Sequence, residues 1–172
     1  MALKELGLSE PSELNLTIKF NSSEAHSAIA QYIQNSWIEK LGINIELSNT
    51  EWQVHLHTLA NKDYQVARLG WSSRYNDGTS LLNMYLTPET GNNYTGWDSE
   101  EYRELIKRAD NELDVDKRID LLKEAEVLFI ADLPLIPIYY YSNPYVVQDY
   151  VLNMVLDALG HVNLKPVDLV ID

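Results

Sequence analysis

The first third of the chain alternates between two hydrophobic periods. Over residues 14–20 every second residue is apolar, and this period of two predicts a half-buried strand. Over residues 24–41 apolar residues recur every three or four positions, which predicts an amphipathic helix that ends before Gly42. Residues 43–47 alternate again. Strand, helix and strand in this order predict a βαβ unit with a parallel strand pair.

The rest of the chain predicts shorter elements of both kinds. Helices are expected over residues 2–6, 51–60, 79–86, 98–113 and 115–131. Strands are expected over residues 64–71, 135–141, 146–147 and 167–171. Asn76-Asp77-Gly78 predicts a turn, Asp98 with Glu101 predicts a capping-box helix start, and Pro134 ends the last helix. The predicted fold class is mixed α/β, with a twisted sheet and flanking helices.

Composition narrows the function classes. The 172 residues fit one domain, the net charge is −13 and there is no Cys. A disulfide scaffold and a thiolate metal site are therefore excluded, and the acidic charge argues against nucleic acid as a partner. The sequence contains no run of about 18 apolar residues, so it predicts no transmembrane helix. The N-terminal residues lack the apolar core of a signal peptide.

Catalytic motifs are missing from the sequence. There is no nucleotide-binding glycine motif and no G-x-S-x-G elbow, so we expect no enzyme activity, no catalytic residues and no cofactor. His55 and His57 are the only close His pair; on a helix they diverge, and we interpret them as two partly exposed side chains and not as a metal site. Three carboxylate pairs lie on or beside helices rich in Lys and Arg and predict solvated faces. They are Glu100/Glu101, Asp114/Asp116 and Glu124/Glu126.

Residues 66–78 combine the features of a ligand-binding strand end. Arg68 and Arg74 offer forked donors for a carboxylate, Trp71 offers a flat wall, and Gly70 permits close approach of another backbone. In α/β proteins such groups at a strand end commonly form the ligand site. The alternative is an ordinary strand whose Arg residues pair with acids.

The sequence resembles the C-terminal part of the oligopeptide-binding proteins, the family 5 solute-binding components of bacterial ABC importers. Motifs in matching order carry this resemblance over nearly the whole chain. They are Phe20-Asn-Ser-Ser-Glu-Ala-His26, Trp37-Ile-Glu-Lys-Leu-Gly-Ile-Asn-Ile-Glu-Leu47, Glu51-Trp52, Tyr64-Gln-Val-Ala-Arg-Leu-Gly-Trp71, Tyr75-Asn76 and Leu133-Pro-Leu-Ile-Pro-Ile-Tyr-Tyr-Tyr141.

The resemblance implies roles for individual residues. Gly70 and Ser72 match positions whose backbone pairs with the ligand peptide, and Trp52 and Trp71 match aromatic residues that line its side-chain pockets. His26 and Arg68 match residues that meet the C-terminal carboxylate of the peptide, depending on its length. The alternatives are a helix N-terminal His and an ion-paired strand Arg.

One position departs from the family pattern. Arg74 stands where many peptide-binding relatives carry an Asp that pairs with the α-ammonium group, and an Arg there repels that group. Asp77 is an alternative partner for the ammonium. A ligand that lacks a free amino terminus, or that carries an acid there, is another interpretation.

The resemblance implies a two-lobed periplasmic-binding-protein-like fold, of which residues 1–172 form a single C-terminal lobe and the N-terminal lobe is absent. We expect capture of oligopeptides outside the cytoplasm, in the periplasm or as a cell-surface lipoprotein, for delivery to an ABC permease. The alternatives are a related lobe for a non-peptide ligand such as an oligosaccharide or metal chelate, a carbohydrate-active enzyme with two carboxylates, or a free-standing interaction module.

Overall fold

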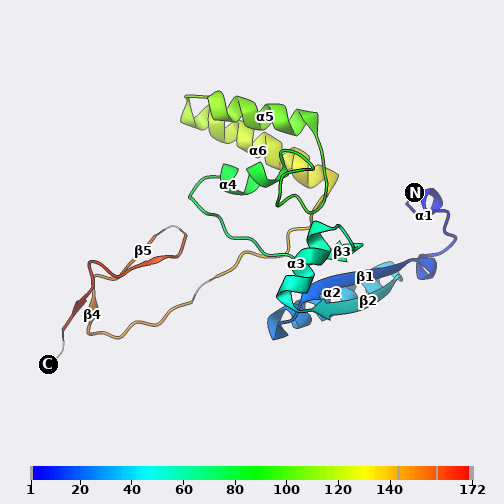
Figure 1. Ribbon diagram of the computed structural model, residues 1–172, viewed down its shortest axis with the longest axis horizontal. Coiled ribbons are helices and arrows are strands. Elements are labelled where there is room, and N and C mark those ends of the chain that lie inside the picture. The colour runs from blue at the N-terminus through cyan, green and yellow to red at the C-terminus, as the bar shows by residue number, and fades with distance from the viewer. Residues whose placement is uncertain (1, 143, 158, 171–172) are drawn as a thin grey trace. The chain divides into compact units, whose positions relative to one another are not determined.

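The computed structural model describes residues 2–142, 144–157 and 159–170 (Figure 1). These residues form two compact units. The first runs to Trp71 and includes Gly91–Gly96, and the second contains Ser72–Thr90 and the chain from Trp97 onward. Each unit is described below by itself.

In the first unit a three-stranded sheet has the order β2-β1-β3, with every pair parallel. Strand β1 (Asn15–Asn21) pairs with β2 (Asn44–Thr50) over its whole length, and β3 (Val66–Ala67) pairs with Ile18 and Lys19 on the other side of β1. The predicted βαβ unit is therefore confirmed. Two short helices precede it, α1 (Ala2–Glu5) and the 3-10 helix η1 (Pro11–Glu13).

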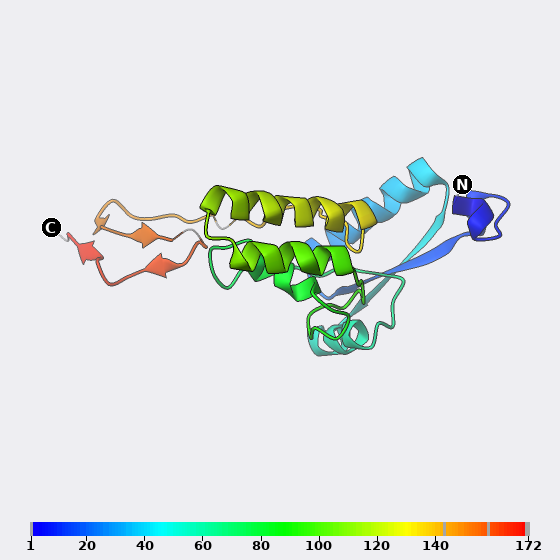
Figure 2. The same ribbon diagram turned by 90° about the horizontal axis from the view of Figure 1, so that it is seen from above.

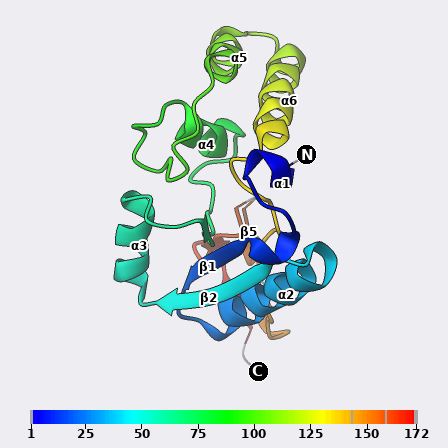
Figure 3. The same cartoon turned by 90° about the vertical axis from the view of Figure 1, so that its right-hand side faces the viewer.

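Two helices enclose this sheet. Helix α2 (Glu24–Leu41) and helix α3 (Trp52–Ala60) lie on opposite sides of it (Figures 2 and 3). The period-two apolar residues Ile18, Ile43 and Ile45 are buried, and Ile33 and Trp37 of α2 pack against them. Gly42 ends α2 with a φ of 68°, in the left-handed region that glycine adopts without strain.

The second unit is built around a helical hairpin. Helix α5 (Glu100–Asn111) packs against α6 (Val115–Asp132), and α4 (Thr79–Leu82) with the 3-10 helix η2 (Asn83–Tyr85) precedes them (Figure 2). The residues that face inward repeat at helical spacing and form one buried cluster. They are Tyr102, Leu105, Ile106, Ala109, Leu122, Ala125 and Phe129. Among the described residues no helix combines the length and apolar character needed to cross a membrane.

Beyond α6 the chain forms two short antiparallel ribbons. Strand β4 (Val151–Leu152) pairs with β7 (Asp168–Leu169), and β5 (Val155–Leu156) pairs with β6 (Val162–Asn163). No described residue from 136 to 170 is buried. This part of the chain therefore contributes no hydrophobic core of its own.

Several predicted elements differ from the structure. Residues 135–141 and 146–147 contain no strand in the described part of the chain. Strand-like composition does not by itself supply the neighbouring strand that a ladder of hydrogen bonds requires. The strand expected over residues 64–71 is only Val66–Ala67, and residues 79–86 divide into α4 and η2. Of the strand predicted over 167–171, β7 is observed and residue 171 lies outside the described residues.

The predicted start of α5 is wrong by one residue. Ser99, and not Asp98, is the N-cap, and its hydroxyl accepts a hydrogen bond from the backbone N–H of Tyr102. Both residues are good cap formers, so the sequence alone did not distinguish them. The mixed α/β class is confirmed.

Candidate functional site

The candidate site in the first unit lies at the carboxyl ends of the parallel strands. Strand β1 lies in the middle of the sheet. The chain continues from β1 through α2 to β2 on one side of β1, and from β2 through α3 to β3 on the other side. At such a reversal of direction, α/β proteins commonly bind ligands beyond the carboxyl ends of the strands. His26, Trp52 and Arg68 each lie just after one of the three strands.

His26 and Arg68 are brought together by the end of β1. Arg68 Nη1 lies 3.5 Å from the side-chain oxygen of Asn21, and His26 Nδ1 lies 3.3 Å from the backbone oxygen of the same residue. A carbonyl only accepts hydrogen bonds, so His26 donates through Nδ1. Residues 42 positions apart in the sequence therefore meet on one strand end.

The imidazole of His26 titrates below its ordinary range. Burial lowers the pKa of His26 because it disfavours the charged ring, and the positive charge of Arg68 lowers that pKa further, against the opposing effect of the Asn21 carbonyl. At neutral pH the pair therefore presents one cation, Arg68, beside a neutral imidazole whose Nε2 accepts hydrogen bonds.

Replacement of Arg68 with Gln should raise the pKa of His26 toward 6.5. The substitution removes the nearby positive charge and leaves a polar side chain of similar length. NMR titration of the imidazole signals in this chain measures the change. Lys40→Gln is the matched control, because Lys40 lies at the other end of α2, ~20 Å away along the helix axis, beyond effective range in physiological salt.

The same shift makes stability depend on pH. Since the folded chain holds the pKa of His26 below 6.5, the unfolded chain binds the proton first as the pH falls. The contribution of His26 to the free energy of unfolding is therefore present above pH 6.5 and is lost as the pH falls from 6.5 through the folded pKa.

In the NMR titration, an unchanged His26 pKa in Arg68→Gln would contradict the proximity of the two groups.

Trp52 and His55 occupy successive turns of α3. Trp52 is 40% exposed, and its ring centroid lies 6.3 Å from that of His55. His55 is fully buried at 0%, so the prediction of two partly exposed histidines is wrong for His55 and holds for the exposed His57. The reason is a specific partner, because His55 Nε2 lies 2.8 Å from the backbone oxygen of Arg68.

The chain directly after β3 leaves its backbone unpaired. Arg68 still donates its N–H to the Lys19 carbonyl at 2.8 Å, which continues the ladder by one bond. Across the described chain, no hydrogen bond is made by the backbone N–H or C=O of Leu69, Gly70 or Trp71. All three residues are partly buried and belong to the first unit. They present main-chain donors and acceptors directly after Arg68 in the chain.

Ser72, Arg74 and Asp77 belong to the second unit. Ser72 and Arg74 are exposed, and the Arg74 N–H donates to the Ser80 hydroxyl at 2.9 Å. Asp77 accepts two hydrogen bonds from Arg118, at 2.8 and 3.0 Å, and two from the N–H and hydroxyl of Thr79.

These donors lower the pKa of Asp77 well below its usual range, with the Arg118 hydrogen bonds as the largest cause. Asp77 thus ties α6 to the start of α4, and its charge is balanced within the unit. A ligand ammonium at Asp77 stays a prediction, and such a ligand would compete with Arg118.

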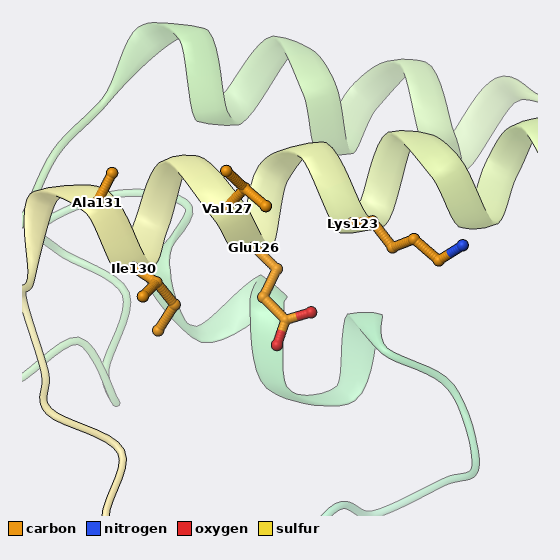
Figure 4. Close-up of a pocket in the computed structure, with 5 residues that line it drawn as sticks. All are labelled: Lys123, Glu126, Val127, Ile130 and Ala131. Atoms are coloured by element: carbon orange, nitrogen blue, oxygen red, sulfur yellow. The ribbon is translucent and has the colours of Figure 1, made fainter.

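Other candidate chemistry lies elsewhere. The six carboxylates of the three acidic pairs are exposed. Within the described part of the chain, no three His, Cys, Asp or Glu side chains gather in the way metal donors do. A surface pocket on α6 is lined by Lys123, Glu126, Val127, Ile130 and Ala131, none of which the sequence marked as functional (Figure 4).

Two residues of the candidate site were missed from the sequence, Asn21 and His55. Asn21 ends β1 and contacts both His26 and Arg68, and the only signal for it was its place at the end of an alternating run. His55 contacts Arg68 through the backbone, which no side-chain pattern reveals.

A family profile described as bacterial extracellular solute-binding proteins, family 5, middle, matches residues 2–93, more than half of the chain. The chain belongs to this family. Members of the family are extracellular solute-binding proteins by this description, as the sequence resemblance predicted.

Individual relatives agree with the family. The chain is similar to the oligopeptide-binding protein OppA of Bacillus subtilis, with 38% identity over 95% of this chain and 30% of the relative. It is also similar to the probable deoxycholate-binding periplasmic protein YgiS of Escherichia coli, with 30% identity over 92% of this chain and 32% of the relative. A solved structure of Haemophilus influenzae OppA in complex with the peptide RPPGFSPFR superposes with a TM-score of 0.82 and 27% identity, over 97% of this chain and 33% of that one. The chain therefore spans about a third of the length of these relatives.

Proposed function

We propose that residues 1–172 are the C-terminal lobe of a solute-binding protein that captures oligopeptides for an ABC importer. The carrying observation is the unpaired backbone of Leu69–Trp71 beside Arg68 at the carboxyl edge of the sheet. An extended peptide that adds to such an edge gains main-chain hydrogen bonds whatever its sequence. The similarity to oligopeptide-binding relatives supports the same solute class.

The side chains around this edge would make the other contacts with the peptide. Arg68 would neutralise the peptide carboxylate, with the neutral His26 beside it, and Trp52 and Trp71 would form tolerant walls for side chains. Gly70 and Ser72 would supply backbone to the ligand. Closure of the N-terminal lobe over this edge would bury the ligand, and the complete protein would act outside the cytoplasm and deliver the peptide to a permease without covalent chemistry.

A non-peptide solute is the second candidate. The relative named as probably deoxycholate-binding is about as similar to this chain as several peptide-binding relatives are. Deoxycholate carries one carboxylate on an apolar body, and Arg68 beside aromatic residues suits that chemistry as well. It offers no main chain, so the unpaired backbone of residues 69–71 favours a peptide.

Mass spectrometry of ligands released from the complete two-lobed protein tests the proposal. Co-purified peptides, together with micromolar or tighter binding of peptides by calorimetry, are expected. Deoxycholate binding without peptide binding would establish the second candidate, and turnover of an oligosaccharide would overturn both. The lobe alone should bind peptides weakly or not at all, because half of the cleft is missing.

Arg74→Asp in the complete protein should strengthen binding of peptides with a free α-ammonium by about tenfold. The substitution replaces a like charge with an opposite one, at an exposed position where each charge interaction is modest. Calorimetry with a peptide and its N-acetylated form measures the effect, and the acetylated peptide should show no gain. Equal or weaker binding of the free peptide would mean that Arg74 does not face the amino terminus.

A further inference from the structure

The β1–β3 ladder stops abruptly, and two histidines occupy the places where it would continue. In a parallel ladder that extended past Arg68, the Arg68 carbonyl would accept from the N–H of Asn21, and the N–H of Gly70 would donate to the Asn21 carbonyl. Neither bond is found among the described residues. Instead His55 Nε2 lies 2.8 Å from the Arg68 oxygen, and His26 Nδ1 lies 3.3 Å from the Asn21 oxygen.

His55 donates a hydrogen bond to the Arg68 carbonyl from a buried position. Its ring is fully buried on α3, and since a carbonyl only accepts, Nε2 carries the proton. Nδ1 is then an acceptor, and it has no hydrogen-bond partner within the described residues. A buried acceptor without a partner is costly, so an apolar side chain would fill this position at less cost if packing were its only role.

We propose that His55 is a positioning residue for ligand binding, which turns the Arg68 carbonyl away from β1 and so keeps the backbone of Leu69–Trp71 free to pair with a ligand. The inference rests on the proposed peptide-binding function. His55 itself touches no ligand, because its ring is buried. It acts through the main chain of Arg68, and it shares α3 with Trp52, whose ring lies 6.3 Å from its own. One buried side chain thus links a proposed pocket wall to the proposed peptide-binding edge.

The direct consequence is a competition between two donors, the His55 Nε2–H and the Asn21 N–H, for the Arg68 carbonyl. When His55 is removed, the Arg68 carbonyl becomes available to the N–H of Asn21, and the ladder can extend toward residues 69–71. An extended ladder would use on β1 the main-chain groups that the ligand needs. Loss of His55 should therefore protect Asn21 and weaken the ligand at the same time.

The experiment compares three variants of the complete protein. His55→Leu removes the donor and keeps an apolar side chain in a buried position, His55→Gln keeps an N–H donor of similar reach, and His57→Leu changes an exposed His on the same helix. We expect the amide hydrogen of Asn21 to exchange at least tenfold more slowly in ligand-free His55→Leu than in the wild type. We expect the same variant to bind peptides at least tenfold more weakly, with His55→Gln and His57→Leu within threefold of the wild type in both measurements.

Each result decides one question. Unchanged or faster exchange of Asn21 in His55→Leu would overturn the inference, as would peptide affinity equal to that of the wild type. Failure of His55→Gln to restore affinity would show a merely structural role and would also overturn it. A wild-type protein that binds no peptide would refute the proposed function, whereas the exchange of Asn21 without ligand would still decide whether His55 ends the ladder.

Discussion

Tyr102→Ala should destabilise the helical hairpin of the second unit by ~3–5 kcal/mol, the usual cost of removing a large aromatic side chain from a packed core. Tyr102 is 0% exposed, its ring packs edge-on against Trp97 at 4.9 Å, and its hydroxyl donates to the Leu82 carbonyl at 2.8 Å. Burial also raises the pKa of the phenol, so the hydroxyl remains a donor at neutral pH. Urea denaturation of this chain, followed by circular dichroism at 222 nm, measures the loss.

Two variants separate the contributions of the ring and the hydroxyl. Tyr102→Phe keeps the ring and leaves the Leu82 carbonyl without its donor, so we expect a smaller loss of ~1–3 kcal/mol. Tyr140→Ala is the matched control, because that side chain is 98% exposed, and its effect should stay within ~0.5 kcal/mol. A midpoint for Tyr102→Ala within error of the wild type would mean that the cluster around Tyr102 does not hold the hairpin together.

The hydrophobic pattern predicted the elements whose partners lie nearby in the sequence. Helix α2 ends at the expected glycine, α6 begins at the expected residue, and β1 and β2 pair as a parallel unit across one helix. Each of these elements buries a periodic face that the sequence displays. Residues 135–141 have a strand-like composition, as β1 and β2 do, and form no strand. Composition favours an extended segment, but it does not specify which other segment will pair with it.

The candidate site shows the same limit more sharply. The resemblance named His26 and Arg68, and the structure places both on Asn21. The resemblance did not reveal that β3 ends at Ala67. The Arg68 carbonyl accepts a hydrogen bond from His55, a helix residue 13 positions earlier in the chain. A hydrogen bond between a backbone carbonyl and a buried imidazole produces no periodic pattern in the sequence. From the sequence, His55 is therefore interpreted, with His57, as a partly exposed side chain.

Arg68→Gln in the complete protein should weaken binding of peptides with a free C-terminal carboxylate by at least thirtyfold. Removal of one partner from a desolvated charge pair costs ~2–5 kcal/mol, and each 1.4 kcal/mol is about tenfold in affinity. Arg68 is partly buried at the strand end, and His26 beside it stays neutral at neutral pH because its pKa is lowered. The guanidinium is therefore the proposed cation for the carboxylate, and calorimetry at neutral pH measures its loss.

Peptides that end in an amide identify the interaction. They lack the carboxylate charge, so Arg68→Gln should change their affinity by less than about threefold, and the wild type should bind them more weakly than the free acids. Lys40→Gln removes a charge from the far end of α2 and should leave both ligands unaffected. If the amide and the acid lost affinity equally in Arg68→Gln, the side chain would support the site without meeting the carboxylate. In that case the unpaired backbone of Leu69–Trp71 would remain as the basis of peptide binding, and a group other than Arg68 would have to meet the carboxylate.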